Sequence, residues 1–484
     1  MGQQDEERRG NEAGETPKAQ VKAKAWSPLH DVHTPVLFGL MLANALIAMD
    51  STILATAVPS VVADLGDYAR FPWLFSIYLL AQAVTVPVYG KLADMFGRKP
   101  VLLFGIAVFV VSSVIAGFAP SMNVLIAARA LQGIGAGAVG PMAMTVLGDI
   151  YTLEQRAKAQ GYMASVWAMS SVFGPLIGGF FAEIGAWRWI FFINVPIAGF
   201  AALLVIRKFS DPGDRTHRKI DVLGSIVLTI GLTALILGIL EGGNSWPWLS
   251  WQTAVAFGSG IVLLALMGLI EPRAEEPVVE FRLLSRRLIV ATSITMLAIG
   301  GLTVGVTSFA PTYLQTAAGA SPIVAGLAVA VMTLGWPLAG GNSGKVYMRR
   351  GFRFTIRLGA TIAIVGSAIL AAIAHWPNPL LLAGAVFVLG LGLGFGTAPS
   401  TIVAQNSVGW DQRAQVTAIN TFARSVGSAV GVAIFGALSN GVLQYLGGEP
   451  NAQNVTIATQ FVFIGVVLGA ILMFVGASLQ PRDR

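Results

Sequence analysis

The sequence lacks cysteine and has few charged residues. Without cysteine, the chain cannot form disulfides, use a thiolate in catalysis or bind metal through sulfur. Charged residues make up only 11% of the 484 positions, whereas a typical soluble domain has about 25%. Hydrophobic residues account for 55%, and the mean hydropathy is +0.71. This composition predicts a membrane protein.

Long polar segments are also scarce. Windows of about 19 residues divide the sequence into fourteen apolar segments, each long enough to cross a bilayer as a helix. They cover residues 36–59, 71–90, 101–119, 123–147, 160–182, 189–206, 221–240, 251–270, 288–315, 322–343, 354–374, 379–404, 413–439 and 459–477. The remainder is a tail and short loops, too small for a catalytic domain of ordinary size.

Basic residues are rare on every second loop. Of the 31 Lys and Arg residues, 27 lie in the N-terminal tail, the even-numbered loops or the C-terminal end. The odd-numbered loops hold only Arg70 and Arg188, while Arg129 and Arg424 lie inside segments. This asymmetry follows the positive-inside rule and predicts that both termini are cytoplasmic. The net charge of +7 therefore reflects membrane topology, and we expect no nucleic-acid partner.

Acidic residues are almost absent from the segments. Of the 24 Asp and Glu residues, only Asp50 lies well inside a segment, while Asp149, Glu183, Glu241 and Glu271 lie at segment ends within reach of water. A carboxylate at the centre of a membrane helix costs about 2.5–3.5 kcal/mol on insertion scales, so its presence indicates a function. We expect Asp50 to gain and lose a proton; the alternative is a structural carboxylate buried against Arg129 or Arg424.

Histidine is equally sparse within the segments. The four histidines lie in the tail, in a loop or at a segment end, at positions 30, 33, 217 and 375. This placement argues against a buried histidine proton relay or a zinc site. We expect no metal and no cofactor.

Charged residues gather in one short loop between the second and third segments. Residues 90–101 read G-K-L-A-D-M-F-G-R-K-P-V, in which Gly90 and Gly97 allow close backbone approach and Asp94 can pair with Arg98 or with a helix N-terminus. The alternative is an ordinary basic turn on the cytoplasmic side.

The fourth and fifth segments carry two further motifs. Arg129 lies near the outer end of the fourth segment, with Gln132 one helical turn further on. This arginine either biases the protonation of a nearby carboxylate or extends to the membrane interface. In the fifth segment, Gly174 and Gly178 form a small-residue groove for a neighbouring helix, and Pro175 frees a backbone carbonyl.

These four elements together resemble the fourteen-helix drug–proton antiporter branch of the major facilitator superfamily. The first segment contributes D-S-T-I at 50–53 and A-V-P at 57–59, in the order typical of that branch. Some members have Asn where this chain has Ala55, so that polar contact is not carried over. The resemblance implies an all-α polytopic membrane protein that exports lipophilic, cationic compounds in exchange for protons. It also implies a bacterial inner-membrane location and a monomer.

The resemblance assigns roles to the motif residues. It implies proton coupling by Asp50 and Arg129, and conformational gating by a second group: Gly90, Asp94, Gly97, Arg98, Gly174, Pro175 and Gly178.

An internal repeat supports two six-helix bundles. G-K-V-Y-M-R-R-G at 344–351 repeats the glycine spacing of 90–97, and G-S-A-V-G at 427–431 repeats that of 174–178. At the first offset Asp50 corresponds to Val304, so the second half has no counterpart carboxylate. We predict a disordered cytoplasmic tail (1–34), an N-terminal bundle (35–207), linkers with two extra helices (208–287), a C-terminal bundle (288–478) and a cytoplasmic C-terminus (479–484).

The substrate cavity is expected between the bundles. Its candidate lining residues are polar or aromatic side chains inside segments: Asn44, Trp73, Tyr78, Gln82, Gln132, Trp167, Gln315, Gln405, Asn406, Asn420 and Arg424. For each of them, a hydrogen bond between helices or anchoring at the interface is an equal alternative. Alternative functions are an exporter of a metabolite, siderophore, amino acid or lipid on the same fold, a polytopic membrane enzyme, and a passive channel.

Overall fold

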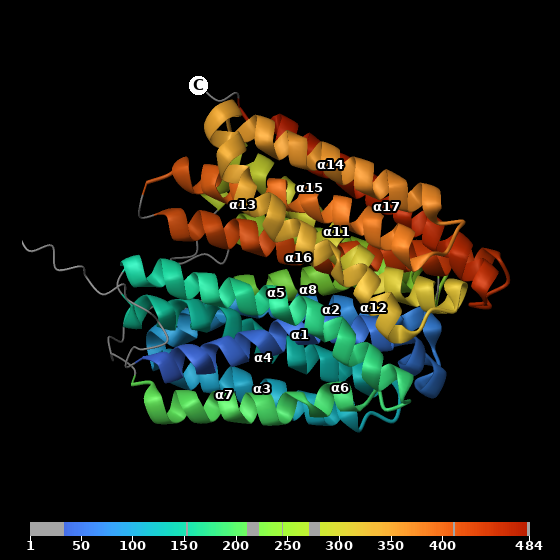
Figure 1. Cartoon of the computed structure of the whole chain (residues 1–484), viewed down its shortest axis with the longest axis horizontal. Helices are drawn as coiled ribbons and strands as arrows, with labels where there is room; N and C mark the ends of the chain where they lie inside the picture. The colour runs from blue at the N-terminus through green and yellow to red at the C-terminus, as the bar shows by residue number, and fades with distance from the viewer. Residues whose placement is uncertain are drawn as a thin grey trace, which may run out of the picture.

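The structure is a computed structural model that describes residues 33–151, 153–210, 222–243, 245–270, 281–409 and 412–481 (Figure 1). The predicted tail at 1–34 lies outside the described residues except for its last two positions. Most of the first linker, and residues 271–280 of the second, also lie outside them.

Within the described residues, fourteen helical spans are long and apolar enough to cross a membrane, which confirms the predicted fourteen. The first six spans are formed by α1 (Thr34–Leu65), α2 (Phe71–Phe96), α3 (Arg98–Gly117), α4 (Met122–Ile150), α5 (Leu153–Glu183) and, together, α6 (Trp189–Phe192) with α7 (Asn194–Lys208). A short 3-10 turn, η2 (Tyr68–Arg70), precedes α2.

Two spans form a separate hairpin, α8 (Val222–Glu241) and α9 (Trp251–Ile270), and a single turn, α10 (Phe281–Leu284), follows it. The last six spans are α11 (Arg287–Ala318), α12 (Pro322–Ala330) with α13 (Met332–Arg350), α14 (Phe352–Ile373), α15 (Pro379–Asn406), α16 (Arg413–Tyr445) and α17 (Ala452–Leu479). Figure 1 shows α1–α7 and α11–α17 as two bundles lying side by side.

Small polar residues define where several helices begin. The side chains of Ser121, Ser321, Asn378 and Asn451 accept hydrogen bonds from the first backbone N–H groups of α4, α12, α15 and α17. Such caps matter at a membrane surface, because the first four N–H groups of a helix have no partner within it. All four lie at the membrane face opposite the one where α1 begins and α17 ends. We call the latter the terminal face.

Glycine turns recur at equivalent points of the two bundles. Gly97 joins α2 to α3 with φ 97° and ψ 160°, and Gly351 joins α13 to α14 with φ 83° and ψ 165°. A residue with a side chain rarely adopts this left-handed region. The predicted seven-residue glycine repeat therefore marks one turn conformation used twice.

Glycine also allows the two pairs of central helices to pack closely. A side chain at Gly174 would overlap Thr52 of α1, and one at Gly178 would overlap the carbonyl oxygen of Ile53. In the second bundle, Gly431 of α16 lies against the backbone of Gly301 in α11. The groove predicted for the fifth segment is thus occupied by α1, and its repeat in α16 is occupied by α11.

The bundles contact each other at the face opposite the terminal face. Gln315 Nε2 donates to the carbonyl oxygen of Thr56 at 3.0 Å, and Asn440 Nδ2 donates to that of Ala69 at 2.6 Å. The rings of Phe71 and Phe309 pack edge to face, with their centroids 5.2 Å apart.

At the terminal face, the described polar contacts stay within one bundle. Lys99 donates to the carbonyl oxygens of Ile206 and Phe209, while Arg286 donates to that of Ser407. The structure therefore represents a conformation closed at the face away from the termini.

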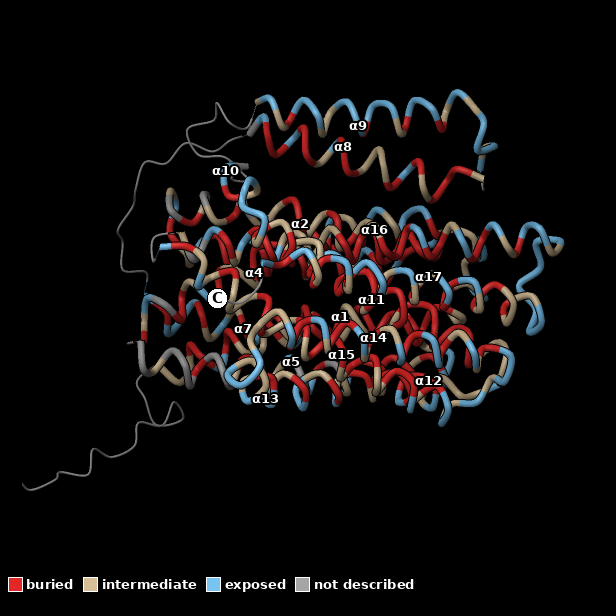
Figure 2. Tube along the Cα trace, turned by 90° about the horizontal axis from the view of Figure 1, so that it is seen from above, coloured by how far each residue is buried: buried red, intermediate tan, exposed pale blue. Residues whose placement is uncertain are grey.

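The hairpin α8–α9 covers one side of the junction between the bundles (Figure 2). Its apolar residues Leu232 and Ile236 pack in one cluster with Leu80 of α2 and Ala433 of α16. Glu241, the last residue of α8, is 7% exposed and accepts a hydrogen bond from Trp73 Nε1 at 2.8 Å. The prediction that this acid reaches water is wrong, because α2 and the turn after α8 enclose it.

Candidate functional site

Asp50 lies at the middle of α1, and its side chain is only 1% exposed. Arg129 of α4 reaches it from across the first bundle, with 2.6 Å between Nη1 and Oδ2. Arg129 is also 1% exposed. Of the two alternatives for this arginine, the structure shows the carboxylate partner and not an extension to the membrane interface.

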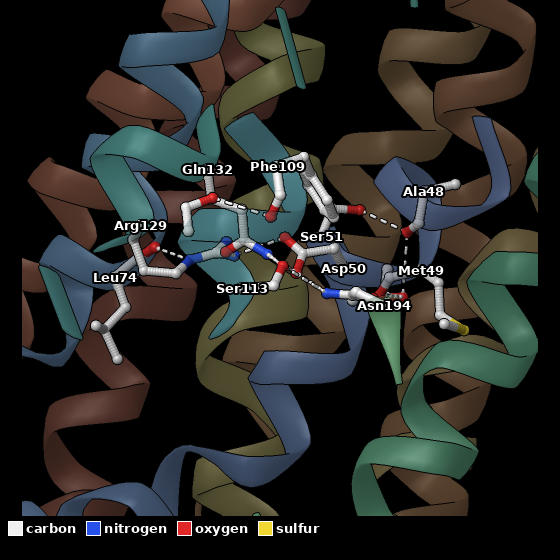
Figure 3. A network of polar contacts seen from close by, with 12 residues as sticks. Ala48, Met49, Asp50, Ser51, Leu74, Phe109, Ser113, Arg129, Gln132 and Asn194 are labelled. Atoms are coloured by element: carbon white, nitrogen blue, oxygen red, sulfur yellow. Dashed lines mark hydrogen bonds and ion pairs between the residues drawn. The ribbon is translucent and has the colours of Figure 1, made fainter. Parts of the chain in front are cut away.

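Three neutral side chains complete the network around the carboxylate (Figure 3). Gln132 Nε2 donates to Asp50 Oδ1 at 2.9 Å and to Ser113 Oγ at 2.9 Å. Asn194 Nδ2 lies 3.5 Å from Asp50 Oδ1 and 3.3 Å from Ser113 Oγ. Both oxygens of the carboxylate are therefore engaged by α4 and α7, and Ser113 links these helices through α3.

Two further contacts fix the guanidinium of Arg129. Its Nε donates to the carbonyl oxygen of Leu74 at 3.1 Å, and its Nη1 donates to Gln132 Oε1 at 2.6 Å. The ring of Tyr78 lies 4.1 Å from the guanidinium carbon, within the range of a cation–π interaction. Arg129 is therefore held by α1, α2 and its own helix at once.

The sequence correctly predicts that Arg129 lies near a carboxylate, Asp50. Its prediction for Gln132 and Tyr78 differs from the structure. It treated Gln132 and Tyr78 as cavity residues, whereas the structure buries both of them in the network. It missed Ser113 and Asn194 as partners. The available signal was an amide inside the apolar sixth segment, since Asn194 is 1% exposed and needs a buried partner.

The arrangement can respond to a single proton. Asp50 and Arg129 neutralise each other in a space that excludes water, and breaking such a pair costs several kcal/mol, about 3–5 when one partner is removed. A proton on Asp50 cancels its charge and leaves the guanidinium unmatched.

Of the remaining cavity candidates in the first bundle, Asn44 is buried, Gln82 is partly buried and Trp167 is exposed. Trp73 points to Glu241 of the hairpin and not to the space between the bundles. In the second bundle, Gln315 crosses to Thr56, Gln405 donates to Thr417 and Asn406 is exposed at the end of α15.

Asn420 is buried and accepts from Thr292 and Ser293 of α11, both at 3.3 Å. These contacts correspond to the alternative of hydrogen bonding between helices.

The loop between α2 and α3 is held to the end of α4. Arg98 Nε lies 3.2 Å from Asp149 Oδ2, so Asp149 is a described partner of Arg98. The side chain of Asp94 lies outside the described residues. Within the described part of the chain, nothing lies within 4 Å of where a side chain at Gly90 would begin, so no described residue makes the close approach predicted there.

A small cavity of about 20 Å³ lies between the two bundles, close to Asp50 along α1. Its polar lining consists of Thr52 and Thr56 of α1 with Thr307 of α11 and Thr333 of α13. A water molecule needs roughly 10–15 Å³, so the cavity has room for one water and none for a drug-sized molecule. At this level the two bundles are in contact.

Comparison with known proteins gives the class to which this fold and site belong. A family model described as Major Facilitator Superfamily matches residues 40–432, and the chain belongs to this family. Its curated relatives include multidrug transporters.

Two of these relatives are from Bacillus subtilis. Multidrug resistance protein 3 is 33% identical over 407 residues, covering 84% of this chain and 80% of that protein. Multidrug transporter protein MdtP is 31% identical over 409 residues, covering 84% of this chain and 75% of that protein.

Solved structures show the same fold at low identity. An autoinhibited peptide transporter of the POT family has a TM-score of 0.67 at 16% identity, covering 93% of this chain and 97% of that one. A bacterial homologue of the human lysosomal transporter Spinster, inward-facing and unoccupied, has a TM-score of 0.66 at 17% identity, with coverages of 93% and 98%. The protein is thus a multi-pass membrane transporter of the major facilitator fold.

Proposed function

We propose that the protein exports lipophilic small molecules, cationic compounds among them, in exchange for protons. The observation that carries the proposal is the enclosed pair of Asp50 and Arg129, the only opposite charges joined deep within the described spans. Relatives named for multidrug resistance and multidrug transport support the choice of substrate.

Proton entry drives the cycle through this pair. With the terminal face in the cytoplasm, a proton that enters across 100 mV releases about 2.3 kcal/mol, and a pH gradient adds to this. Protonation of Asp50 releases Arg129, and separation of α1 from α4 changes how the first bundle packs against the second. Once the helices have separated, Asp50 can lose its proton and bind a cationic substrate in its place. Proton and cation therefore compete for the same carboxylate.

The described conformation is then the inward-open one, since its bundles meet at the opposite, external face. We propose that the protein works as a monomer in a bacterial inner membrane. The gating role of Gly97 and Arg98 is supported by the positive-φ turn at Gly97 and by the ion pair of Arg98 with Asp149, which fixes the loop against α4.

The test is proton-driven transport by the full chain in liposomes, with matched variants on one helix. Asp50→Asn keeps the side-chain shape but cannot ionise, and we expect it to lower substrate-dependent proton release at least about tenfold. Asp64→Asn is the control, because Asp64 lies at the exposed end of α1 and pairs with Arg188. We expect it to transport normally.

Unchanged coupling in Asp50→Asn would show that the proton is carried elsewhere. Proton release by the wild type with an anionic metabolite, but with no lipophilic cation, would favour the metabolite-exporter alternative.

A further inference from the structure

Arg424 is a second arginine deep in the membrane, and its surroundings contrast with those of Arg129. Arg424 lies on α16, and its backbone carbonyl oxygen packs against Gly300. Because Gly300 is near the middle of α11, Arg424 lies deep in the bundle. Its side chain is partly exposed. Among the described residues, no carboxylate, carbonyl oxygen or aromatic ring contacts its guanidinium.

The neighbours of Arg424 show which way this part of α16 faces. On one flank, Gly427 packs against the backbone of Leu297 in α11. On the other, the carbonyl oxygen of Ala429 accepts from Ser76 of α2, at 3.2 Å. The residues between these flanks face the space between the bundles.

The stripe between the two flanks is polar. Thr421 is exposed, Ser425 is partly exposed and Ser428 is buried. Only Ser428 has a described side-chain hydrogen bond, which it donates to the carbonyl oxygen of Arg424 at 3.1 Å. The hydroxyl groups of Thr421 and Ser425, together with the guanidinium, form a set of donors suited to an oxyanion.

The charge balance points in the same direction. Asp50 and Arg129 cancel each other, so Arg424 leaves the described space between the bundles with one excess positive charge. Charged side chains inside membrane segments are costly and rare, and they usually face a partner or a substrate pathway. Among the described residues, no protein partner balances the charge of Arg424.

We infer that Arg424 binds the acidic group, a carboxylate or phosphate, of an amphipathic substrate between the bundles. This inference rests on the proposed export function and deepens it. The exported compounds include zwitterions and lipophilic acids, held by Arg424 on the second bundle while the first bundle handles the proton. The planar guanidinium suits bidentate contact with such a group, which a lysine cannot reproduce.

The test uses a rhodamine dye as its free acid and as its methyl ester, which differ only in the ionisable carboxyl. Binding of each dye to the purified full chain in phosphatidylcholine nanodiscs is measured by fluorescence anisotropy. We expect Arg424→Gln to weaken binding of the acid about tenfold, which is about 1.4 kcal/mol. Binding of the ester should change by less than about twofold, and Arg424→Lys should give an intermediate loss for the acid.

Arg357→Gln is the control, because it removes one positive charge from the terminal end of α14, where Arg357 stacks on Phe474. It should leave both dyes unaffected. The inference is overturned if Arg424→Gln weakens binding of the acid and the ester equally. It is also overturned if the variant binds the acid as tightly as the wild type does.

Two further arms separate related explanations. In the first arm, phosphatidylglycerol is added to the nanodisc. If it competes with the acid dye, a lipid headgroup is the natural acidic group. If it does not compete, the ligand is a soluble amphiphile. A normal Arg424 effect on binding, combined with no proton release during dye transport, counts against the proposed antiport and leaves this inference intact.

Discussion

The two bundles share a backbone plan but differ in the chemistry of their interiors. Helices α1 and α11 each have 32 residues, and the glycine turns at Gly97 and Gly351 have nearly the same dihedral angles. At the level of Asp50, however, the second bundle has Thr303 and Val304.

The first bundle therefore contains a closed network of opposite charges, whereas the second contains one arginine with no described acid. The comparison teaches that helix packing and buried charge are separable. Glycine positions let the helices approach in both halves, but a buried carboxylate is described in only one. Under the proposed function, the first bundle handles the proton and the second supplies contacts to the substrate.

The largest expected difference between the bundles appears when one arginine is removed from each of them. Arg129→Gln leaves Asp50 buried without its charged partner, which costs about 3–5 kcal/mol, so we expect a fall of several degrees in apparent melting temperature or a failure to express. Arg424→Gln breaks no described contact and should leave the melting temperature unchanged or higher. Thermal unfolding followed by size-exclusion chromatography measures both.

The double variant Asp50→Asn/Arg129→Gln checks the cause. It removes both charges together, so stability should largely return while proton coupling stays absent. If the double variant is as unstable as Arg129→Gln alone, the loss comes from packing around the guanidinium and not from an unpaired carboxylate.

The intermediate effect tests what the bundles have in common. Alanine at Gly178 or at Gly431 would collide with backbone atoms of α1 or α11, and overpacking of this kind costs typically about 1–3 kcal/mol. We expect similar drops in melting temperature for both variants. Gly384→Ala in α15 is the control, since open space surrounds this glycine. A loss at only one of the two positions would break the proposed equivalence of the packing.

Much of this architecture is predictable from the sequence, because lipid imposes simple rules. A spanning helix must satisfy its own backbone, so the fourteen apolar segments indicate fourteen helices. Motif spacing also locates the turns at Gly97 and Gly351.

The side-chain network is less predictable. Asn194 meets Asp50 because α7 packs beside α1, and Ser113 meets Gln132 and Asn194 because α3 packs beside α4 and α7; no local pattern encodes this packing. Glu241 looks solvent-accessible at a helix end, but α2 covers it. A residue's partners depend on helix rotation and tilt, and packing between helices sets both.

The smallest expected effect compares one buried amide in each bundle. Asn194 approaches Asp50 and Ser113 at 3.5 and 3.3 Å, and Asn420 accepts from Thr292 and Ser293 at 3.3 Å. Hydrogen bonds between membrane helices contribute on average about 0.6 kcal/mol, so alanine at either position should lower the melting temperature by only about a degree. Their functional effects should differ, because of the two only Asn194 contacts Asp50, the carboxylate that we propose carries the proton.

We therefore expect Asn194→Ala to reduce substrate-dependent proton release about two- to threefold, since loss of about 0.6 kcal/mol changes an equilibrium by roughly that factor. Asn420→Ala should leave proton release per substrate unchanged. A pH-sensitive dye enclosed in the liposomes measures both. Reduced coupling in Asn420→Ala would show that the second bundle also takes part in proton transfer, and the separation of roles between the bundles would then fail.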